Sequence, residues 1–237
     1  DTPRQMAEIA AAEGTARFVH VSAMGVDRAR STYARSKSEG EAAVLEAFPP
    51  ATILRPGVVF GPEDGFFNFF ARMARISPFL PLIGGGNTRL QPVYVGDVAR
   101  AVATVLDKAP EEVGGRTYVL AGPEIYSLKD IYALVMDQIQ IRRPLIPVPW
   151  ALAKAQGFVF ENLPGRILTR DQVETLKTDN ILHPGERRLE DLGIEPTLAE
   201  LILPGYLDKY RPGGRFADTH HAQEVMGSND DRTNKAS

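Results

Sequence analysis

Residues 18–37 read FVHVSAMGVDRARSTYARSK, a short apolar run followed by a polar loop and the start of a helix. The run at 18–21 contains two β-branched valines and is flanked by glycines, a pattern that predicts a buried strand. A helix over 33–48 places Tyr33 and Lys37 on one face, because residues four apart in an α-helix are neighbours. The order strand, loop, helix predicts the beginning of an α/β unit.

The residues Tyr33 and Lys37 have the chemistry of a proton-transfer pair. An ammonium close to a phenol favours the phenolate, which can take up or release a proton. Ser22 stands at the end of the preceding strand, where its hydroxyl could polarise the same substrate oxygen. Each residue also has a structural alternative. Lys37 could pair with Glu41 at i,i+4, which is worth only ~0.3 kcal/mol, and Ser22 could cap a turn.

The rest of the chain alternates strands and helices, an order typical of parallel, doubly wound sheets. We therefore predict an α/β fold with a Rossmann-like, doubly wound parallel sheet. The predicted strands are 52–55, 91–95, 117–121 and 145–148, and the predicted helices are 66–76, 98–108 and 128–139, with Asp97 and Ser127 as N-caps of the last two.

Three regions follow from this alternation. We expect residues 1–143 to be the C-terminal part of a Rossmann domain, and residues 144–211 to be a small, mostly helical lobe for a substrate or partner. Residues 212–237 are polar and poor in large apolar side chains, so we expect a disordered tail. The chain starts within a helix-like segment without an initiator methionine, and we expect it to be part of a longer protein.

The composition of the 237 residues is that of an ordinary globular protein, with 43% hydrophobic and 24% charged residues. A net charge of −3 gives no reason to expect nucleic acid as a partner. There is no cysteine, which excludes disulfides and thiolate chemistry. The apolar segment 145–160 is too short and too polar to span a bilayer. It is predicted either to pack against the sheet or to contact a partner or membrane surface.

An ordered set of motifs resembles the short-chain dehydrogenase/reductase superfamily, in its extended and atypical branches. The set comprises Ser22, Tyr33-x-x-x-Lys37, Arg55-Pro56-Gly57 and the stretch QPVYVGDVA at 91–99. In open α/β sheets, ligands bind beyond the carboxyl ends of the strands, which is where these motifs are predicted to lie.

The resemblance implies a role for each residue around the nicotinamide of a bound NADP(H) or NAD(H). Tyr33 would be the general acid/base, Lys37 would hold the nicotinamide ribose, and Ser22 would orient a substrate carbonyl. The residues that would line the nicotinamide are Pro56, Gly57, Val58 and Val59.

Two features depart from the pattern of that family. Ser22 is followed by Ala23, whereas many extended members carry two or three serines at this strand end. If the catalytic serine belongs one position later, Ala23 occupies its place. No Gly-x-Gly-x-x-Gly turn opens a helix after a strand, so the half that binds pyrophosphate would come from about a hundred preceding residues. The glycines at 84–86 are expected in a connector loop, with Arg89 as either an anion contact or a solvated charge.

The C-terminal part of the sequence narrows the resemblance to one branch. That branch contains the nucleotide-binding accessory subunit of respiratory complex I and its bacterial relatives. The resemblance implies that NADPH is a structural cofactor there, and that the subunit lies at the junction of the peripheral and membrane arms. The matching stretches are ILTRDQVE at 167–174, DN at 179–180, LEDLGI at 189–194 and LPGYL at 203–207.

We therefore expect an NAD(P)-binding accessory protein of complex I type, with complex I subunits as partners and a mainly structural dinucleotide. One alternative is an active NAD(P)-dependent reductase, epimerase or dehydratase that acts on a small carbonyl or nucleotide-sugar substrate. Another is an interaction module without nucleotide. The expected location is the cytoplasm, peripheral on the inner membrane, or the mitochondrial matrix in a eukaryote.

Overall fold

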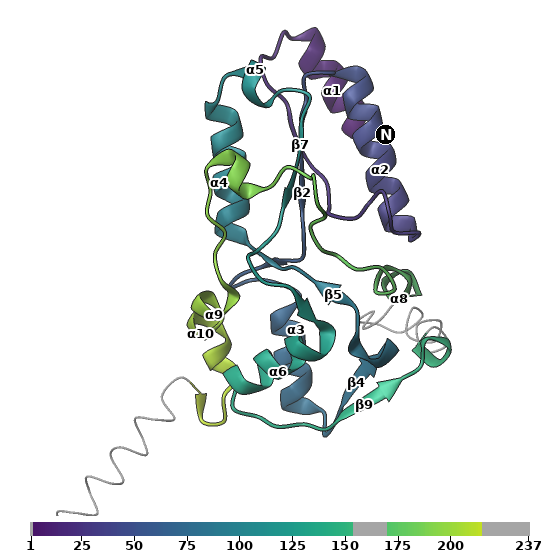
Figure 1. Ribbon diagram of the computed structural model, residues 1–237, viewed down its shortest axis with the longest axis vertical. Coiled ribbons are helices and arrows are strands. Elements are labelled where there is room, and N and C mark those ends of the chain that lie inside the picture. Colours follow the sequence, from purple (N-terminus) through teal and green to yellow (C-terminus); the bar gives the residue numbers. More distant parts are fainter. Residues whose placement is uncertain (1, 154–169, 215–237) are drawn as a thin grey trace, which may run out of the picture.

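The structure is a computed structural model that describes residues 2–153 and 170–214. Its central sheet contains the strands β1 (Val19–Val21), β2 (Thr52–Pro56) and β7 (Thr117–Leu120), which are parallel and lie in the order β1-β2-β7. The helices α1 (Thr2–Ala12) and α2 (Thr32–Ala47) lie on one side of this sheet, and α4 (Val95–Asp107) lies on the other (Figure 1). The predicted α/β fold with a Rossmann-like parallel sheet is confirmed.

The middle strand β2 carries the apolar residues that hold both helical layers to the sheet. Ile53 and Leu54 are fully buried, and successive side chains of a strand point to opposite faces. Ile53 packs with Val44 of α2, whereas Leu54 packs with Val105 of α4. At the free edge of the sheet, Val21 of β1 is 43% exposed.

A second packing unit lies below the sheet in Figure 1 and is built from segments far apart in the sequence. Its core joins Phe60, Phe67 and Ile131 to Leu203 and Leu207, all of them fully buried. The elements are α3 (Phe67–Ile76), α6 (Leu128–Gln138), α9 (Ala199–Ile202), α10 (Pro204–Leu207) and η3 (Asp208–Tyr210), together with the parallel pair β4 (Leu80–Ile83) and β9 (Leu145–Val148).

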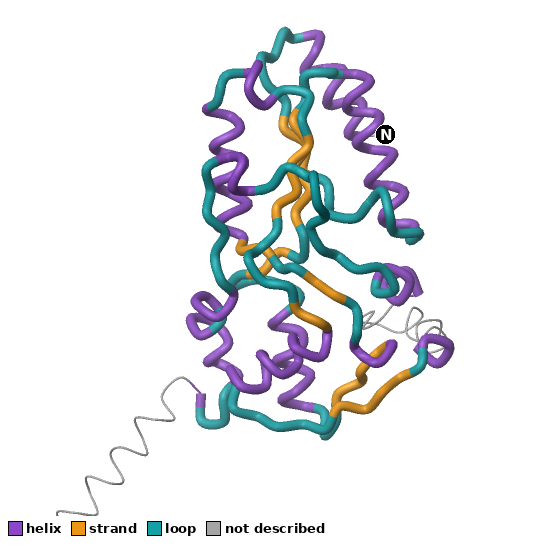
Figure 2. The backbone as a smooth tube through the Cα atoms, viewed as in Figure 1, coloured by secondary structure: helices purple, strands orange, loops and turns teal. Residues whose placement is uncertain are grey.

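The strand β4 directly precedes the glycines at 84–86, which were expected in a connector loop and form a 3-10 turn. Several further short elements join the larger ones, as Figure 2 shows. These elements are the pair β3 (Val59–Phe60) and β6 (Val93–Tyr94), the pair β5 (Arg89–Leu90) and β8 (Tyr126–Ser127), η1 (Gly84–Gly86), α5 (Pro110–Val113), α8 (Arg170–Thr175) and η2 (Leu189–Leu192). Residues 154–160 of the apolar segment 145–160 and most of the predicted tail lie outside the described residues.

The two helix caps predicted from the sequence have different outcomes. Ser127 is the N-cap of α6, since its Oγ accepts from the Asp130 N–H at 3.1 Å. The prediction for Asp97 is wrong, because α4 begins at Val95 and its N-cap is Tyr94. Asp97 is instead fully buried in the first turn, where it accepts hydrogen bonds from Thr197. Within the described ranges, no helix is long and apolar enough to cross a membrane.

Candidate functional site

A cavity of about 250 Å³ lies where the ends of β1 and β2 meet the start of α2. This is the position at which doubly wound sheets bind their ligands, beyond the carboxyl ends of parallel strands. Four stretches of chain form its wall. They are the loop after β1 with Ala23 to Val26 and Ala29, the start of α2 with Tyr33 and Ala34, the end of β2 and the residues after it with Pro56 to Val58, and the end of α8 and the segment after it with Thr175, Leu176 and Thr178 to Asn180; Phe66 and Leu90 complete the wall.

Four of the predicted site residues meet at this cavity, namely Tyr33, Pro56, Gly57 and Val58. The Tyr33 side chain is 51% exposed, so its phenol is open to a ligand. Lys37 lies one turn further along α2, and Val59 begins β3. Neither of them is part of the cavity wall.

Ser22 lies behind the cavity wall rather than in it. Its backbone N–H donates to the Leu54 carbonyl at 2.8 Å, and its side chain is 4% exposed. The buried Ser22 Oγ has no hydrogen-bond partner within the described part of the chain. The next residue, Ala23, does line the cavity. The side chain presented by this strand end is therefore a methyl group, and the predicted role of Ser22 stays a prediction.

Gly57 sits where three other groups crowd the backbone. A Cβ at this position would lie 2.7 Å from the Gln91 carbonyl oxygen and 3.3 Å from the Met24 Cε. Only glycine fits such a close approach without a shift of the backbone. The glycine that ends the Arg55-Pro56-Gly57 motif thus lets other segments of the chain pack closely against this part of the cavity wall.

The start of α2, which carries Tyr33, is held by a residue from the far end of the sequence. The Ser31 Oγ accepts from the Ala34 N–H at 3.1 Å as the N-cap. The Asp171 carboxylate of α8 accepts from the backbone N–H groups of Thr32 and Tyr33, at 2.6 Å and 3.1 Å. A negative charge at this end of a helix is also favoured by the helix dipole. The sequence reasoning missed this contact.

The structure does not support the pairing of Lys37 with Glu41. The nearly buried Glu41 carboxylate accepts from Arg55 Nε at 2.9 Å and from Arg55 Nη2 at 2.6 Å. Asp27 binds the third nitrogen of the same guanidinium at 3.0 Å. The hydrogen bonds that Arg55 donates to Glu41 raise the pKa of Arg55. Lys37 has no ion-pair partner among the residues described, which leaves its ammonium available to a ligand.

Arg89 and the glycines at 84–86 have structural roles. Arg89 Nε donates to Asp179 Oδ2 at 2.8 Å, and the Arg89 backbone N–H donates to Asp179 Oδ1 at 2.8 Å. This pairing favours a structural ion pair over an anion contact. Gly84 lies against the Trp150 ring, since a Cβ on Gly84 would come within 2.0 Å of it. The three glycines form a tight turn with positive φ values, as predicted for a connector.

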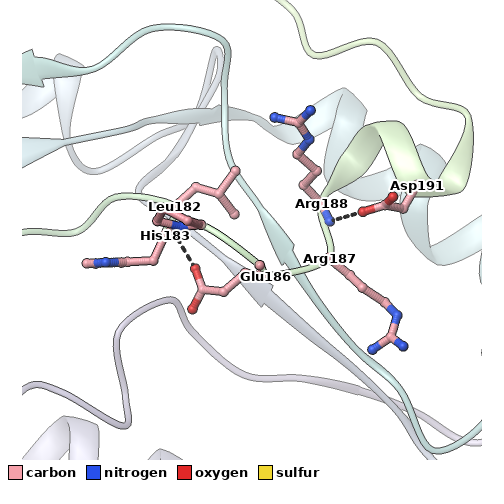
Figure 3. Close-up of a pocket in the computed structure, with 8 residues that line it drawn as sticks. Leu182, His183, Glu186, Arg187, Arg188 and Asp191 are labelled. Carbon is pink, nitrogen blue, oxygen red and sulfur yellow. Dashed lines mark hydrogen bonds between the residues drawn. The ribbon is translucent and has the colours of Figure 1, made fainter.

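A larger depression of about 620 Å³ lies along residues 182–191, and Figure 3 shows the side chains that line it. Arg187 and Arg188 project to opposite sides in this view. The Glu186 carboxylate is occupied by the His183 N–H at 2.7 Å and by Arg28 Nη1 at 3.0 Å. The polar side chains that line this larger depression therefore do not converge on one point. We place the candidate site in the smaller cavity.

Comparison with known proteins supports the resemblance that the sequence motifs indicate. Residues 27–156 match the family model of the RmlD substrate binding domain. The chain belongs to this family. It is 33% identical over 211 residues to the mitochondrial NADH dehydrogenase (ubiquinone) 1 alpha subcomplex subunit 9 of Arabidopsis thaliana, over 85% of this chain and 52% of that protein. The corresponding subunit of Mus musculus is 34% identical over 88% of this chain and 55% of its own length.

The chain thus spans about half the length of these curated relatives. Among solved structures, an NADPH-dependent quinone oxidoreductase from Escherichia coli matches with a TM-score of 0.67 and 20% identity, over 84% of this chain and 68% of that one. A dTDP-glucose 4,6-dehydratase from Streptomyces venezuelae matches with a TM-score of 0.63 and 17% identity, over 88% and 64%. The predicted resemblance to extended short-chain dehydrogenases, and to the complex I accessory subunit, is confirmed.

Proposed function

We propose that this chain is the nicotinamide-side part of an NAD(P)-binding accessory protein of complex I type. The observation that carries the proposal is the cavity at the carboxyl ends of β1 and β2, which brings Tyr33 together with Pro56, Gly57 and Val58. These residues would hold the nicotinamide of NADP(H) or NAD(H), with the Lys37 ammonium directed to the ribose. The names of the relatives, which are subunits of an NADH dehydrogenase, support the assignment to complex I.

The dinucleotide is proposed to stabilise the protein rather than to react. When bound, a nicotinamide supplies hydride chemistry, but a reductase of this type also needs a hydroxyl beside the substrate carbonyl. The cavity wall carries Ala23 at that strand end, while the Ser22 hydroxyl is buried behind it. Ligand that binds only the folded state raises stability, which is a sufficient role for a bound dinucleotide.

As partners we propose other subunits of complex I. The corresponding location is the matrix side of the mitochondrial inner membrane, or the cytoplasmic side of the membrane in a bacterium, in peripheral contact. The mitochondrial names of the relatives support the first location if the source is a eukaryote.

The direct test is to purify the full-length protein and to identify what it carries. We expect a nicotinamide dinucleotide to be released on denaturation, and its removal to lower the midpoint of thermal unfolding. We expect no consumption of NADPH with carbonyl compounds or nucleotide-sugars. Turnover that is lost in Tyr33→Phe would contradict the structural role.

A second function, that of an active NAD(P)-dependent reductase, epimerase or dehydratase, is favoured by the exposed Tyr33 phenol at the cavity. For this function Tyr33→Phe should reduce turnover about 10²–10⁴-fold, the usual contribution of a general acid/base. Lys37→Ala should reduce it as well, and full activity in that variant would exclude this mechanism. A full-length protein that binds no dinucleotide at all would favour an interaction module.

A further inference from the structure

Asn180 reaches the cavity from the segment after α8, and its backbone is held in place like that of a strand. The Asn180 N–H donates to the Arg89 carbonyl at 2.8 Å, and the Asn180 carbonyl accepts from the Gln91 N–H at 2.9 Å. A parallel bridge to Leu90 accompanies these two bonds. The side chain of Asn180 therefore projects from a fixed point of the cavity wall.

The orientation of the Asn180 amide follows from the hydrogen bond that its side-chain nitrogen makes. Its Nδ2 donates to the Met24 carbonyl at 3.0 Å, and a carbonyl can only accept, so the NH2 group must face Met24. The Asn180 Oδ1 is consequently the amide atom that takes no part in the bond to Met24. It is buried and has no hydrogen-bond partner in the part of the chain that the structure describes. A buried acceptor without a donor is unfavourable and calls for an explanation.

That oxygen lies close to Gly57. The Asn180 Oδ1 is 3.4 Å, and the Met24 Cε is 3.3 Å, from the point that a Cβ on Gly57 would occupy. The point that a Cβ on Gly57 would occupy is thus bordered by two hydrogen-bond acceptors, the Gln91 carbonyl oxygen at 2.7 Å and the Asn180 Oδ1, and by one flexible methionine side chain. Methionine has three rotatable bonds, so its methyl group can move aside for a ligand.

We infer that Asn180 Oδ1 accepts a hydrogen bond from the carboxamide N–H of the nicotinamide ring. The inference rests on the proposed function, in which Pro56, Gly57 and Val58 line that ring. The Asn180 side chain lines the same cavity as these residues, so the carboxamide of a ring bound there would supply the N–H donor that Asn180 Oδ1 lacks, once the Met24 methyl group moves aside. Asn180 is a binding residue in this arrangement, since it touches the cofactor and not the reacting atoms.

The test compares NADP⁺ with its 3-acetylpyridine analogue, in which a methyl group replaces the NH2 of the carboxamide, by calorimetric titration of the full-length protein. We expect wild type to bind NADP⁺ about fivefold more tightly than the analogue, the effect of one neutral hydrogen bond. In Asn180→Ala this preference should disappear, while the affinity for 2′-phospho-ADP-ribose, which has no nicotinamide, should stay unchanged.

A control variant tests whether the preference depends on Asn180. Asn87→Ala, which changes an exposed asparagine outside the cavity wall, should keep the preference for NADP⁺. A preference that persists in Asn180→Ala, or a wild type without any preference, would overturn this inference alone. A wild type that binds neither dinucleotide nor 2′-phospho-ADP-ribose would overturn the proposed function together with it.

Discussion

Gly57 shows how a single residue shapes the candidate site. Three groups surround the space that a Cβ would need, namely the Gln91 carbonyl oxygen, the Met24 Cε and the Asn180 Oδ1. All three come from segments far from Gly57 in the sequence, which only the folded chain brings together. The motif Arg55-Pro56-Gly57 could therefore be found in the sequence, but the reason for its glycine could not.

Gly57→Ala is predicted to damage both stability and binding. Its Cβ would lie 2.7 Å from a backbone oxygen, which cannot move as a flexible side chain can. We expect a loss of about 1–3 kcal/mol in the free energy of unfolding, measured with urea, and at least about tenfold weaker dinucleotide binding. Gly65→Ala is the matched control, because a Cβ there meets no atom within 4 Å. Equal effects of the two substitutions would contradict the steric argument.

His20 is predicted to make the fold sensitive to mild acid. Burial, and then repulsion by the Lys37 ammonium, lower the pKa of His20 from 6.5, while Glu41 opposes the shift. Below about pH 6.5 the unfolded chain therefore binds more protons at this residue than the folded chain does. Stability that is present above this pH is lost as the pH falls through the lowered pKa.

His20→Gln should remove this part of the acid sensitivity. The comparison is between free energies of unfolding at about pH 7.5 and pH 5.5, where wild type should lose more stability than the variant. Lys37→Met removes only the repulsion by the Lys37 ammonium. Its loss of stability should lie between that of wild type and that of His20→Gln. If His20→Gln loses as much stability as wild type, other groups dominate in this range.

At the scale of elements, α8 and the start of α2 form the most informative contact. Asp171 lies 138 residues from Tyr33 in the sequence, yet its carboxylate holds the first backbone N–H groups of the tyrosine helix. The wall of the cavity next to Tyr33 also comes from the segment that follows α8. Docking of α8 is therefore expected to order the site.

Asp171→Ala should loosen the start of α2 without unfolding the protein. We expect faster hydrogen exchange at the amides of Thr32 and Tyr33, and a loss of about 1 kcal/mol in stability, as for a removed helix cap. Lys177→Ala, an exposed change just after the same helix, is the control and should leave the exchange at α2 unchanged. Unchanged exchange in Asp171→Ala would show that the Ser31 cap is sufficient.

The elements that were predicted well from the sequence are those whose structure is determined by residues close to them in the chain. The buried strand β2, the helix with Tyr33 and the Ser127 cap each follow from neighbouring residues, and all three are present. Asp97 was expected to cap a helix because it precedes an apolar run. Its actual partner, Thr197, is 100 residues away, and no local pattern could indicate it. The contacts of Asp171 and Asn180 escaped prediction for the same reason.

At the scale of the molecule, the segment around Thr197 connects α4, which packs on the sheet, to the lower packing unit. Asp97 is fully buried in α4 and accepts from the Thr197 N–H at 2.7 Å, from Thr197 Oγ1 at 2.9 Å and from Arg100 Nη2 at 2.6 Å. The helices α9 and α10 follow directly and complete the lower core.

Asp97→Ala should destabilise the whole protein. It leaves the Thr197 donors without an acceptor in a partly buried place, which costs about 1–3 kcal/mol. The measurement is the midpoint of thermal unfolding, with Asp107→Ala at the exposed end of the same helix as control. A midpoint equal to that of wild type would mean that solvent replaces the buried carboxylate.

The central claim is that the nicotinamide end of a dinucleotide lies in the cavity beside Tyr33. Saturation-transfer NMR on the full-length protein with NADP⁺ tests it, since this method reports which ligand protons touch the protein. We predict strong saturation of the nicotinamide protons in wild type, and a selective loss of that signal in Tyr33→Ala with the adenine signal retained. Saturation of the adenine protons alone in wild type would contradict the account.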